Sequence, residues 1–422
     1  MNTNISEWAF FLPQGWPESN LMIVFGILLA FGTLGGVLAA RLRWLPTITG
    51  FMAVGLLIGP SGLGLLSAAA LQDARVWVDI ALGLILFKLG AVLHPWLLAH
   101  DRSLLVVSLV ECGLTFAGIG ALMLWLDASP VVAVIVAAIA VSSSPAVLIH
   151  VAEELHAAGP AIDTAEALVA MNNVLAFVLF SLALPVALYD AKFSIATVVV
   201  LPAYQLLGAV GVGVAVGWAA SQIASRTRAE DGHLRFALVV GAVMLALGLA
   251  VALKVSTLFT AITLGVASRW MQGSSKLTTV AFGGGGDVFF IILFVFAGAN
   301  LHLHELLAYW PLVLAYVATR TMAKCMGAYA ASKSFGRPHK QAVATGMLLV
   351  PMAGLAIGLV QTTTGLIPEL GARVSAVVLA SVAVFETFGP PIAAFAVRIS
   401  GEAGRALVPD RSPDDVPPIG EG

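Results

Sequence analysis

Apolar stretches of about 20 residues recur along almost the whole chain, separated by short polar segments. A helix of that length crosses a hydrocarbon core about 30 Å thick, so the pattern predicts about thirteen transmembrane helices. The predicted spans cover residues 20–40, 46–66, 77–92, 104–126, 130–152, 165–188, 196–225, 234–253, 255–272, 280–300, 306–332, 341–364 and 371–397. The fold class we predict is therefore an all-α polytopic membrane protein.

The placement of positive charge tests these spans independently, because short loops rich in Lys and Arg stay on the cytoplasmic side. With the N-terminus outside, the predicted outer side holds only Arg75, Lys192, Lys254 and Arg373, and most of the 21 Lys and Arg residues fall on the inner side. One missing helix would scramble this alternation. The charges therefore predict an external N-terminus and a cytoplasmic C-terminus.

Three regions follow from the spans. We expect an extracytoplasmic segment at 1–19, a transmembrane domain at 20–398, and a cytoplasmic disordered tail at 399–422 that is rich in Pro and Asp. A fused nucleotide-binding regulatory domain is not expected. The composition agrees with a chain that lives in lipid, since 59% of the residues are hydrophobic, 10% are charged and the mean hydropathy is +0.98. A formal net charge of −2 gives no reason to expect a nucleic-acid partner.

Two predicted spans carry breaks at matching positions. The span 130–152 contains Ser142-Ser143-Ser144-Pro145, and the span 341–364 contains Val350-Pro351-Met352-Ala353-Gly354. Proline interrupts the hydrogen bonds of a helix, and exposed backbone in a membrane must face protein or a wet cavity. Because the second break lies seven helices after the first, and an odd offset inverts the direction of crossing, the pattern predicts inverted repeats with crossed broken helices. An ordinary proline kink in each span is the alternative.

Polar and charged side chains within predicted spans are costly in lipid, so they mark functional sites by default. The candidates for ion binding and transport, with the serines of the first break, are Glu111, Ser142, Ser143, Ser144, Asn172, Asn173, Arg320, Lys324 and Glu386.

Each charged candidate also has a plainer interpretation. Arg320 and Lys324 lie four residues apart on one helix face and require a partner, but Lys324 can also extend toward the interface. Glu111 can be a structural carboxylate paired with a base. Glu386 precedes Gly389-Pro390-Pro391 and can satisfy backbone donors at a helix break.

No arrangement typical of an enzyme is present. The segment Gly283–Asp287 lacks the Gly-Lys-Ser/Thr of a phosphate-binding loop, no serine lies in Gly-x-Ser-x-Gly, and the eight histidines form no helical ligand pair. We expect no enzyme activity, no cofactor and no metal site other than one for a transported cation.

The chain resembles the sodium/hydrogen exchanger domain of the cation:proton antiporter superfamily, on its potassium-efflux and bacterial exchanger branch. The resemblance covers nearly all of residues 20–398. Its carriers are Leu45-Pro46 through Gly50, Gly59 through Gly64, Ser142 through Ala146, Asn172-Asn173, Arg320 with Lys324 through Gly327, Gly346 through Gly358, and Val384-Phe385-Glu386 with Gly389-Pro390. It implies a homodimer in a bacterial inner (plasma) membrane, a core bundle that moves like an elevator, and an ion-binding carboxylate on the sixth helix near a basic residue of the eleventh.

One position departs from the family pattern. Where the family usually has Asp, this chain has Asn173, preceded by Asn172. An amide can coordinate a cation through its oxygen but cannot exchange a proton near neutral pH. Either Glu111, Glu386 or Lys324 takes over proton exchange, or the protein no longer exchanges protons.

Our first hypothesis is a monovalent cation (Na+ or K+):proton antiporter in which Ser142–Ser144 and the two asparagines supply oxygen ligands, Arg320 and Lys324 tune the charge, and Glu386 or Glu111 exchanges the proton. The alternatives are transport of an anionic solute on the same fold, since amides beside two bases leave the site positive, and an antiport-inactive membrane sensor or scaffold.

Overall fold

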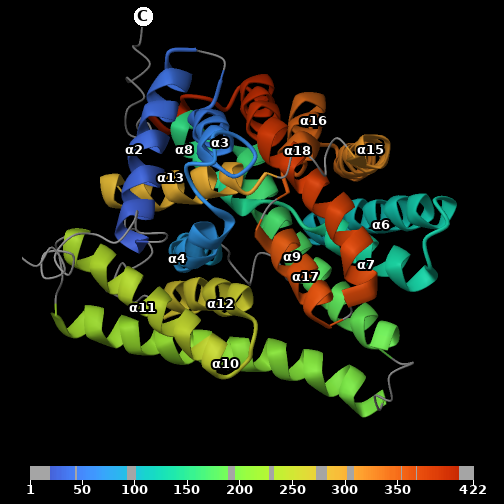
Figure 1. Ribbon diagram of the computed structural model, residues 1–422, viewed down its shortest axis with the longest axis horizontal. Helices are drawn as coiled ribbons and strands as arrows, with labels where there is room; N and C mark the ends of the chain where they lie inside the picture. Colours follow the sequence, from blue (N-terminus) through green and yellow to red (C-terminus); the bar gives the residue numbers. More distant parts are fainter. Residues whose placement is uncertain are drawn as a thin grey trace, which may run out of the picture.

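The computed structural model describes residues 20–42, 45–92, 101–188, 195–227, 232–271, 283–301, 308–352, 354–366 and 368–407. These residues are almost entirely helical (Figure 1). The helices are α2 (Leu21–Ala40), α3 (Thr47–Ile58), α4 (Ala68–Val92), α6 (Arg102–Trp125), α7 (Pro130–Val141), α8 (Pro145–Glu154), α9 (Pro160–Leu188), α10 (Ile195–Thr227), α11 (Gly232–Ala252), α12 (Thr257–Trp270), α13 (Gly283–Ala299), α15 (Trp310–Ser334), α16 (His339–Leu348), α17 (Gly354–Leu366) and α18 (Pro368–Ser400), followed by the short 3-10 helix η3 (Arg405–Leu407).

Every predicted span corresponds to one helix or to one pair of half-helices, and the chain is a multi-pass membrane protein. Within the described residues, 7 helical stretches are long and apolar enough to cross a membrane by themselves, the pair α7–α8 counting as one. Two of the remaining spans are shorter than predicted, since α3 has 12 residues and α12 has 14. Helix α4 is longer than predicted and begins at Ala68 instead of residue 77, because the Ser67 hydroxyl accepts from the Ala70 amide and Leu71 and Ala74 are buried.

Both predicted breaks are confirmed. Helix α7 ends at Val141, residues 142–144 are non-helical, and α8 begins at Pro145, with the Ser144 side chain capping its first turn. The second break separates α16 from α17, where the backbone leaves the helix after Leu348 and resumes it at Gly354. Proline at the first position of α8 lacks only an amide that would be unpaired there in any case.

The helices divide into two bundles by their contacts. The first bundle contains α2, α3, α4, α10, α11, α12 and α13, and the second bundle contains α6, α7, α8, α9, α15, α16, α17 and α18. In Figure 1 the helices α10, α11 and α12 lie along one edge of the molecule, and α6, α7, α15 and α16 lie on another. Helices of the second bundle therefore include both broken segments.

Glycines allow close helix packing within the first bundle. A side chain at Gly55 of α3 would collide with the backbone of Val295, and one at Gly298 of α13 would collide with Met52. Small residues at such crossings let backbones approach, which is how helices associate in lipid where the hydrophobic effect between them is weak.

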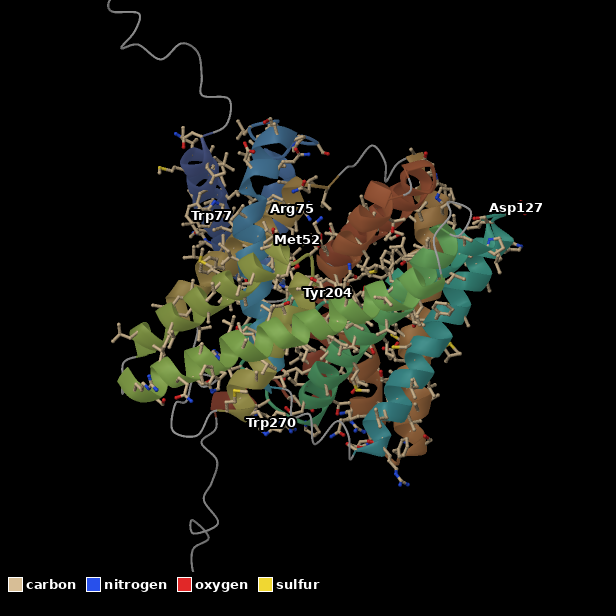
Figure 2. The ribbon with its side chains drawn as sticks, turned by 90° about the horizontal axis from the view of Figure 1, so that it is seen from below. Met52, Arg75, Trp77, Asp127, Tyr204 and Trp270 are labelled. Atoms are coloured by element: carbon tan, nitrogen blue, oxygen red, sulfur yellow. The ribbon has the colours of Figure 1, made fainter. Side chains whose placement is uncertain are left out.

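The two broken segments enter the membrane from opposite sides. Helix α7 follows the turn at Asp127, which Figure 2 places toward the same side as Arg75 and away from Trp270. Helix α16 follows the turn that holds Arg337. The Arg337 guanidinium donates to Ser103 at the start of α6, the end opposite to Asp127, and to Thr164 near the start of α9. The predicted inverted arrangement of the breaks is therefore present.

The chain stays ordered beyond residue 399, where the disordered tail was predicted to begin. Helix α18 continues to Ser400, and Glu402 is buried because its carboxylate accepts from the amides of Ala161 (2.8 Å) and Ile162 (3.0 Å) at the start of α9. An acidic group at a helix N-terminus satisfies amides that have no partner within the helix. The predicted N-terminal segment 1–19 and the remainder of the predicted tail, 408–422, lie outside the described residues.

Candidate ion site at the helix crossing

The two breaks touch each other. The Ser144 amide donates to the carbonyl of Pro351 (2.8 Å), and the Ser143 hydroxyl donates to the carbonyl of Leu349 (3.0 Å). Backbone groups that each half-helix leaves unpaired are thus satisfied by the other. At this point α7 and α16 both end, so the carbonyl ends of two helices, with their partial negative charge, meet in the centre of the second bundle.

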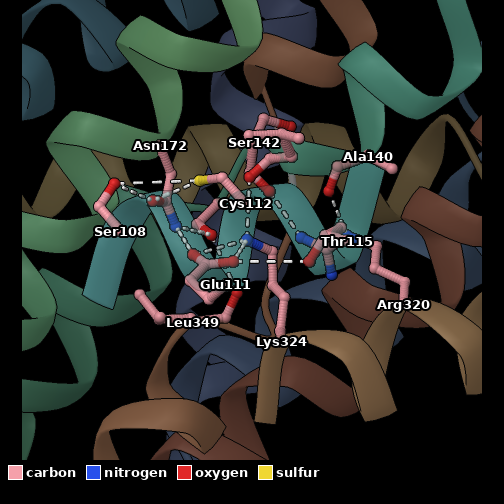
Figure 3. A network of polar contacts seen from close by, with 12 residues as sticks. Ser108, Glu111, Cys112, Thr115, Ala140, Ser142, Asn172, Arg320, Lys324 and Leu349 are labelled. Carbon is pink, nitrogen blue, oxygen red and sulfur yellow. Dashed lines mark hydrogen bonds and ion pairs between the residues drawn. The ribbon is translucent and has the colours of Figure 1, made fainter. Parts of the chain in front are cut away.

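Arg320 of α15 neutralises these carbonyl ends (Figure 3). Its side chain is fully buried and donates to the carbonyls of Ala140 (2.8 Å), Ser142 (2.6 Å) and Val350 (2.6 Å). The guanidinium also lies over the ring of Phe385, 4.4 Å from its centre. Arg320 therefore joins both broken segments to α15 and α18.

Lys324, one turn further along α15, is also fully buried and has a different partner. Its ammonium lies 3.1 Å from each carboxylate oxygen of Glu111 on α6 and donates to the carbonyl of Val141 (2.9 Å). The plainer interpretation, in which Lys324 extends to the interface, is wrong. The two basic residues tolerate each other because one faces carbonyls and the other a carboxylate.

Asn172 of α9 completes this cluster. Its amide nitrogen donates to Glu111, and its oxygen accepts from the Cys112 thiol (3.1 Å) and the Ser108 hydroxyl (3.4 Å). Asn172 and Glu111 are both fully buried. We call Glu111, Asn172 and Lys324 the crossing triad.

Asn173 faces another way. Its oxygen accepts from the Ser143 amide (3.1 Å), and the residue lines a small pocket of about 20 Å³ together with Ser144. A volume of this size holds about one water molecule or one bare ion. The pocket is therefore lined by polar residues of the break and of α9, and Asn173 directly follows Asn172 of the crossing triad.

Gly327 lets α15 approach α6 at this point. A Cβ atom at Gly327 would lie 2.6 Å from the Cα atom of Glu111. Because Gly327 is three residues after Lys324, it lies on the same face of α15. The close approach brings the ammonium within reach of the short Glu side chain.

A family model covers most of the chain. Residues 26–397 match the family described as sodium/hydrogen exchanger, transmembrane.

The chain belongs to the sodium/hydrogen exchanger family.

The fold is also that of a solved sodium proton antiporter, MjNhaP1 from Methanocaldococcus jannaschii. The two structures align with a TM-score of 0.64 and 18% sequence identity, over 92% of this chain and 98% of the other. Comparison with curated proteins gave no significant match. Family and fold are those of transporters rather than catalytic enzymes.

In this member of the exchanger family, Glu111 provides a carboxylate beside the middle of α9, where the chain has two amides. The sixth predicted span corresponds to α9, and both of its central polar residues are amides, Asn172 and Asn173. The carboxylate that contacts Asn172 comes instead from α6. The sequence named Glu111 as a candidate but gave no means of placing it against Asn172.

Glu386 is the one charged candidate that the structure places apart from the crossing triad. It lies on α18, is 4% exposed, and lines a cavity of about 350 Å³ between the two bundles. Residue Phe385 faces Arg320, so the adjacent Glu386 projects from a different side of the helix. Our first hypothesis grouped Glu386 with the other candidates, whereas the structure places it in a separate cavity.

At the opposite end of the interface, polar contacts join the bundles of the exchanger. Lys88 of α4 forms an ion pair with Glu153 of α8, and the Glu154 carboxylate accepts from the amide (3.1 Å) and the hydroxyl (2.8 Å) of Thr47 at the start of α3. The cavity lined by Glu386 lies toward the other ends of α4 and α13, near Leu71 and Leu301. The interface is thus hollow at one end and bonded at the other.

Sequence reasoning missed Ser108, Cys112 and Thr115. With Glu111 they lie at spacings of three and four residues and form a polar stripe on α6, which Figure 3 shows facing Asn172 and Lys324. Thr115 is buried and donates to Glu111 (3.5 Å). A helical-periodicity test applied to polar residues within that apolar span finds this stripe.

Proposed function

We propose that this chain exchanges a monovalent cation, Na+ or K+, for protons, and that Glu111 is the carboxylate for which the two compete. One observation carries the proposal: a fully buried carboxylate is in contact with both Asn172 of α9 and a buried ammonium. The family supplies the general activity, and Glu111 supplies the exchangeable charge that Asn173 cannot.

Charge balance gives the mechanism. With Glu111 ionised and Lys324 protonated, the pair is neutral, and Arg320 is compensated by helix carbonyls. A cation that binds the Glu111 oxygens takes the place of the ammonium, and the proton that leaves Lys324 keeps the site neutral. The reverse steps release the cation and take up a proton. The single negative charge of Glu111 can neutralise either the bound cation or the protonated Lys324, but not both.

Oxygen ligands for a dehydrated cation are near the carboxylate. The hydroxyl of Ser143 lies 3.4 Å from the Asn172 amide nitrogen, and Asn173 lines the small pocket. Hydroxyl, amide and carboxylate oxygens are suitable ligands for hard cations. We assign the bound cation to this group of oxygens.

Movement of the second bundle against the first would expose the site to each side in turn. The crossing triad lies wholly within the second bundle, and the contacts of Lys88 and Thr47 with α8 are ones that such a movement breaks. We expect the first bundle to remain fixed and to form the contact in a homodimer. Inverted repeats with broken helices are typical of transporters that use such alternating access.

The proposal is tested in proteoliposomes that contain a pH-sensitive dye. Pulses of Na+ or K+ over roughly pH 6–9 should change the internal pH, and Glu111→Gln should abolish the response. The matched control is Asp127→Asn, which makes the same charge change at the exposed turn after α6 and should leave exchange intact. No response from the unmodified protein to either cation would overturn the proposal.

The structure gives less support to an anionic substrate. Three nitrogens of Arg320 donate to carbonyls, and Lys324 contacts Glu111 and a carbonyl, so both bases already have partners in the second bundle. A scaffold without transport has no use for the crossing triad, whose buried charges are expensive in lipid.

A further inference from the structure

The cavity between the bundles contains a carboxylate that the exchange mechanism above does not use. Glu386 lines the cavity, is 4% exposed, and has no hydrogen bond or ion pair with any described residue. A buried carboxylate without a partner is unusual, because burial removes its hydration without compensation. Such a group is either protonated or compensated by a cation that enters the cavity.

The charges around the cavity favour a cation. Among the described residues that line it, the ionisable ones are Arg75, Asp79 and Glu386, a net charge of −1 when all are ionised. Asp79 and Arg75 lie four residues apart on α4 and interact with each other. Glu386 is left as the uncompensated group.

The cavity also leads toward the crossing. Leu82, Ala146, Leu258 and Gly354 line both the large cavity and the small pocket that contains Asn173. A cation that enters from the hollow end of the interface therefore passes Glu386 before it reaches the Asn173 oxygen. The walls are mostly apolar, so a carboxylate is the strongest attraction along this route.

We propose that Glu386 is a loading site for a monovalent cation, separate from the crossing triad and on the path to it. The inference rests on the proposed function for the identity of the ion as the transported one. A volume of about 350 Å³ accommodates a cation that keeps part of its water shell, which the apolar walls do not replace. Glu386 thus raises the local cation concentration beside the site at which dehydration occurs.

A cysteine introduced into the cavity reports the charge of Glu386 in an assay that does not depend on transport. Ala383 lines the cavity one helical turn before Glu386. In detergent solution, the Ala383→Cys thiol should react faster with cationic aminoethyl methanethiosulfonate than with anionic sulfonatoethyl methanethiosulfonate, by about tenfold relative to their rates with a free thiol, as expected for one nearby unit charge at intermediate dielectric. Glu386→Gln should remove this preference. The Cys325→Ala parent without Ala383→Cys gives the background from native thiols.

Binding of a cation at Glu386 should protect the Ala383→Cys thiol from the cationic reagent, and this protection measures binding. At constant ionic strength, replacing N-methylglucamine chloride with NaCl or KCl should slow the cationic reagent in the protein with Glu386 and not in Glu386→Gln. Glu386→Asp keeps the charge and should keep the preference, which separates loss of charge from loss of fold. Asp79→Asn should change the preference less than Glu386→Gln.

The inference would be overturned if the Ala383→Cys thiol showed the same preference for the cationic reagent with Glu386 and with Glu386→Gln. Both proteins must elute as single species in this comparison. If the protein with Glu386 shows the reagent preference and the protection by Na+ or K+, but the unmodified protein exchanges no cation for protons in proteoliposomes, the proposed function alone would be overturned. Reduced apparent affinity for the cation in Glu386→Gln, with the maximal exchange rate less affected, is the expected transport result.

Discussion

Two buried glutamates of this chain occupy opposite environments. Glu111 is held at the crossing by an ammonium, an amide and a hydroxyl, and is fully enclosed in the second bundle. Glu386 lines a cavity between the bundles and has no partner among the described residues. The first carboxylate is part of a satisfied polar network, whereas the second is exposed to whatever enters the cavity.

The two environments predict different effects of each glutamate on the stability of the fold. Removing one member of a buried ion pair leaves the other charge uncompensated, which is strongly destabilising. Removing an unpaired buried charge takes away a desolvation penalty instead. The same substitution, Glu to Gln, should therefore have opposite effects on folding at the two positions, while both affect transport.

The largest expected effect on stability is at Lys324. Lys324→Met leaves the Glu111 carboxylate buried without its ammonium and should lower the free energy of unfolding by about 3–5 kcal/mol. Thermal unfolding in detergent measures the change. Lys333→Met, at the exposed end of the same helix, is the control and should have little effect. A melting temperature for Lys324→Met equal to that of the unmodified protein would contradict the claim that Glu111 depends on the Lys324 ammonium.

A smaller loss is expected at Gly327. The Cβ atom of Gly327→Ala would lie 2.6 Å from Glu111 Cα, so α6 and α15 must separate, at about 1–3 kcal/mol. Gly113→Ala, on α6 where nothing lies within 4 Å of the added atom, is the matched control and should stabilise slightly. Equal stability of both variants in the same thermal assay would show that the approach at Glu111 is not tight.

Glu386→Gln should not destabilise the protein. Because no described group pairs with the Glu386 carboxylate, the neutral amide should leave the melting temperature unchanged or raise it, by up to about 1 kcal/mol in unfolding free energy at neutral pH. A clear loss of stability would show that Glu386 has a structural partner and would remove the contrast with Glu111.

The smallest effect concerns Asp101, a third carboxylate outside the spans, at the start of α6. Partial burial raises its pKa, but hydrogen bonds from Ser103 and Leu104 and the nearby Arg337 outweigh burial and hold the pKa below its ordinary value of 3.8. A lowered pKa stabilises the fold above the unfolded-state pKa, and this contribution is lost as the pH falls through the folded-state pKa.

The melting temperature of Asp101→Asn should therefore lie slightly and constantly below that of the unmodified protein from pH 8 to about pH 5, with the difference shrinking in stronger acid. A difference that grew on acidification would contradict the sign of the pKa shift.

The helices and both breaks were predictable from sequence because they depend on local rules: apolar length for the spans, and proline or serine for the breaks. Contacts across the bundle were not. The i, i+4 spacing of Arg320 and Lys324 required a partner, but only the approach of α6 at Gly327 identifies Glu111 as that partner.

Glu386 shows the same limit. Its depth along α18 follows from counting residues, yet the side of the helix that it faces depends on how Phe385 packs against Arg320. The beginning of the predicted tail was wrong for a related reason, since composition cannot show that Glu402 caps a helix that begins some 240 residues earlier in the chain. Local propensity does not record such long-range contacts.

The central claim is that Glu111 supplies the charge that the α9 amides lack. Exchange in proteoliposomes should be abolished in Glu111→Gln and restored, at least in part, when Asn173→Asp is added to that variant, because a carboxylate then returns to the crossing from the neighbouring helix. Glu111→Gln that exchanges cations for protons at the rate of the unmodified protein would contradict the claim.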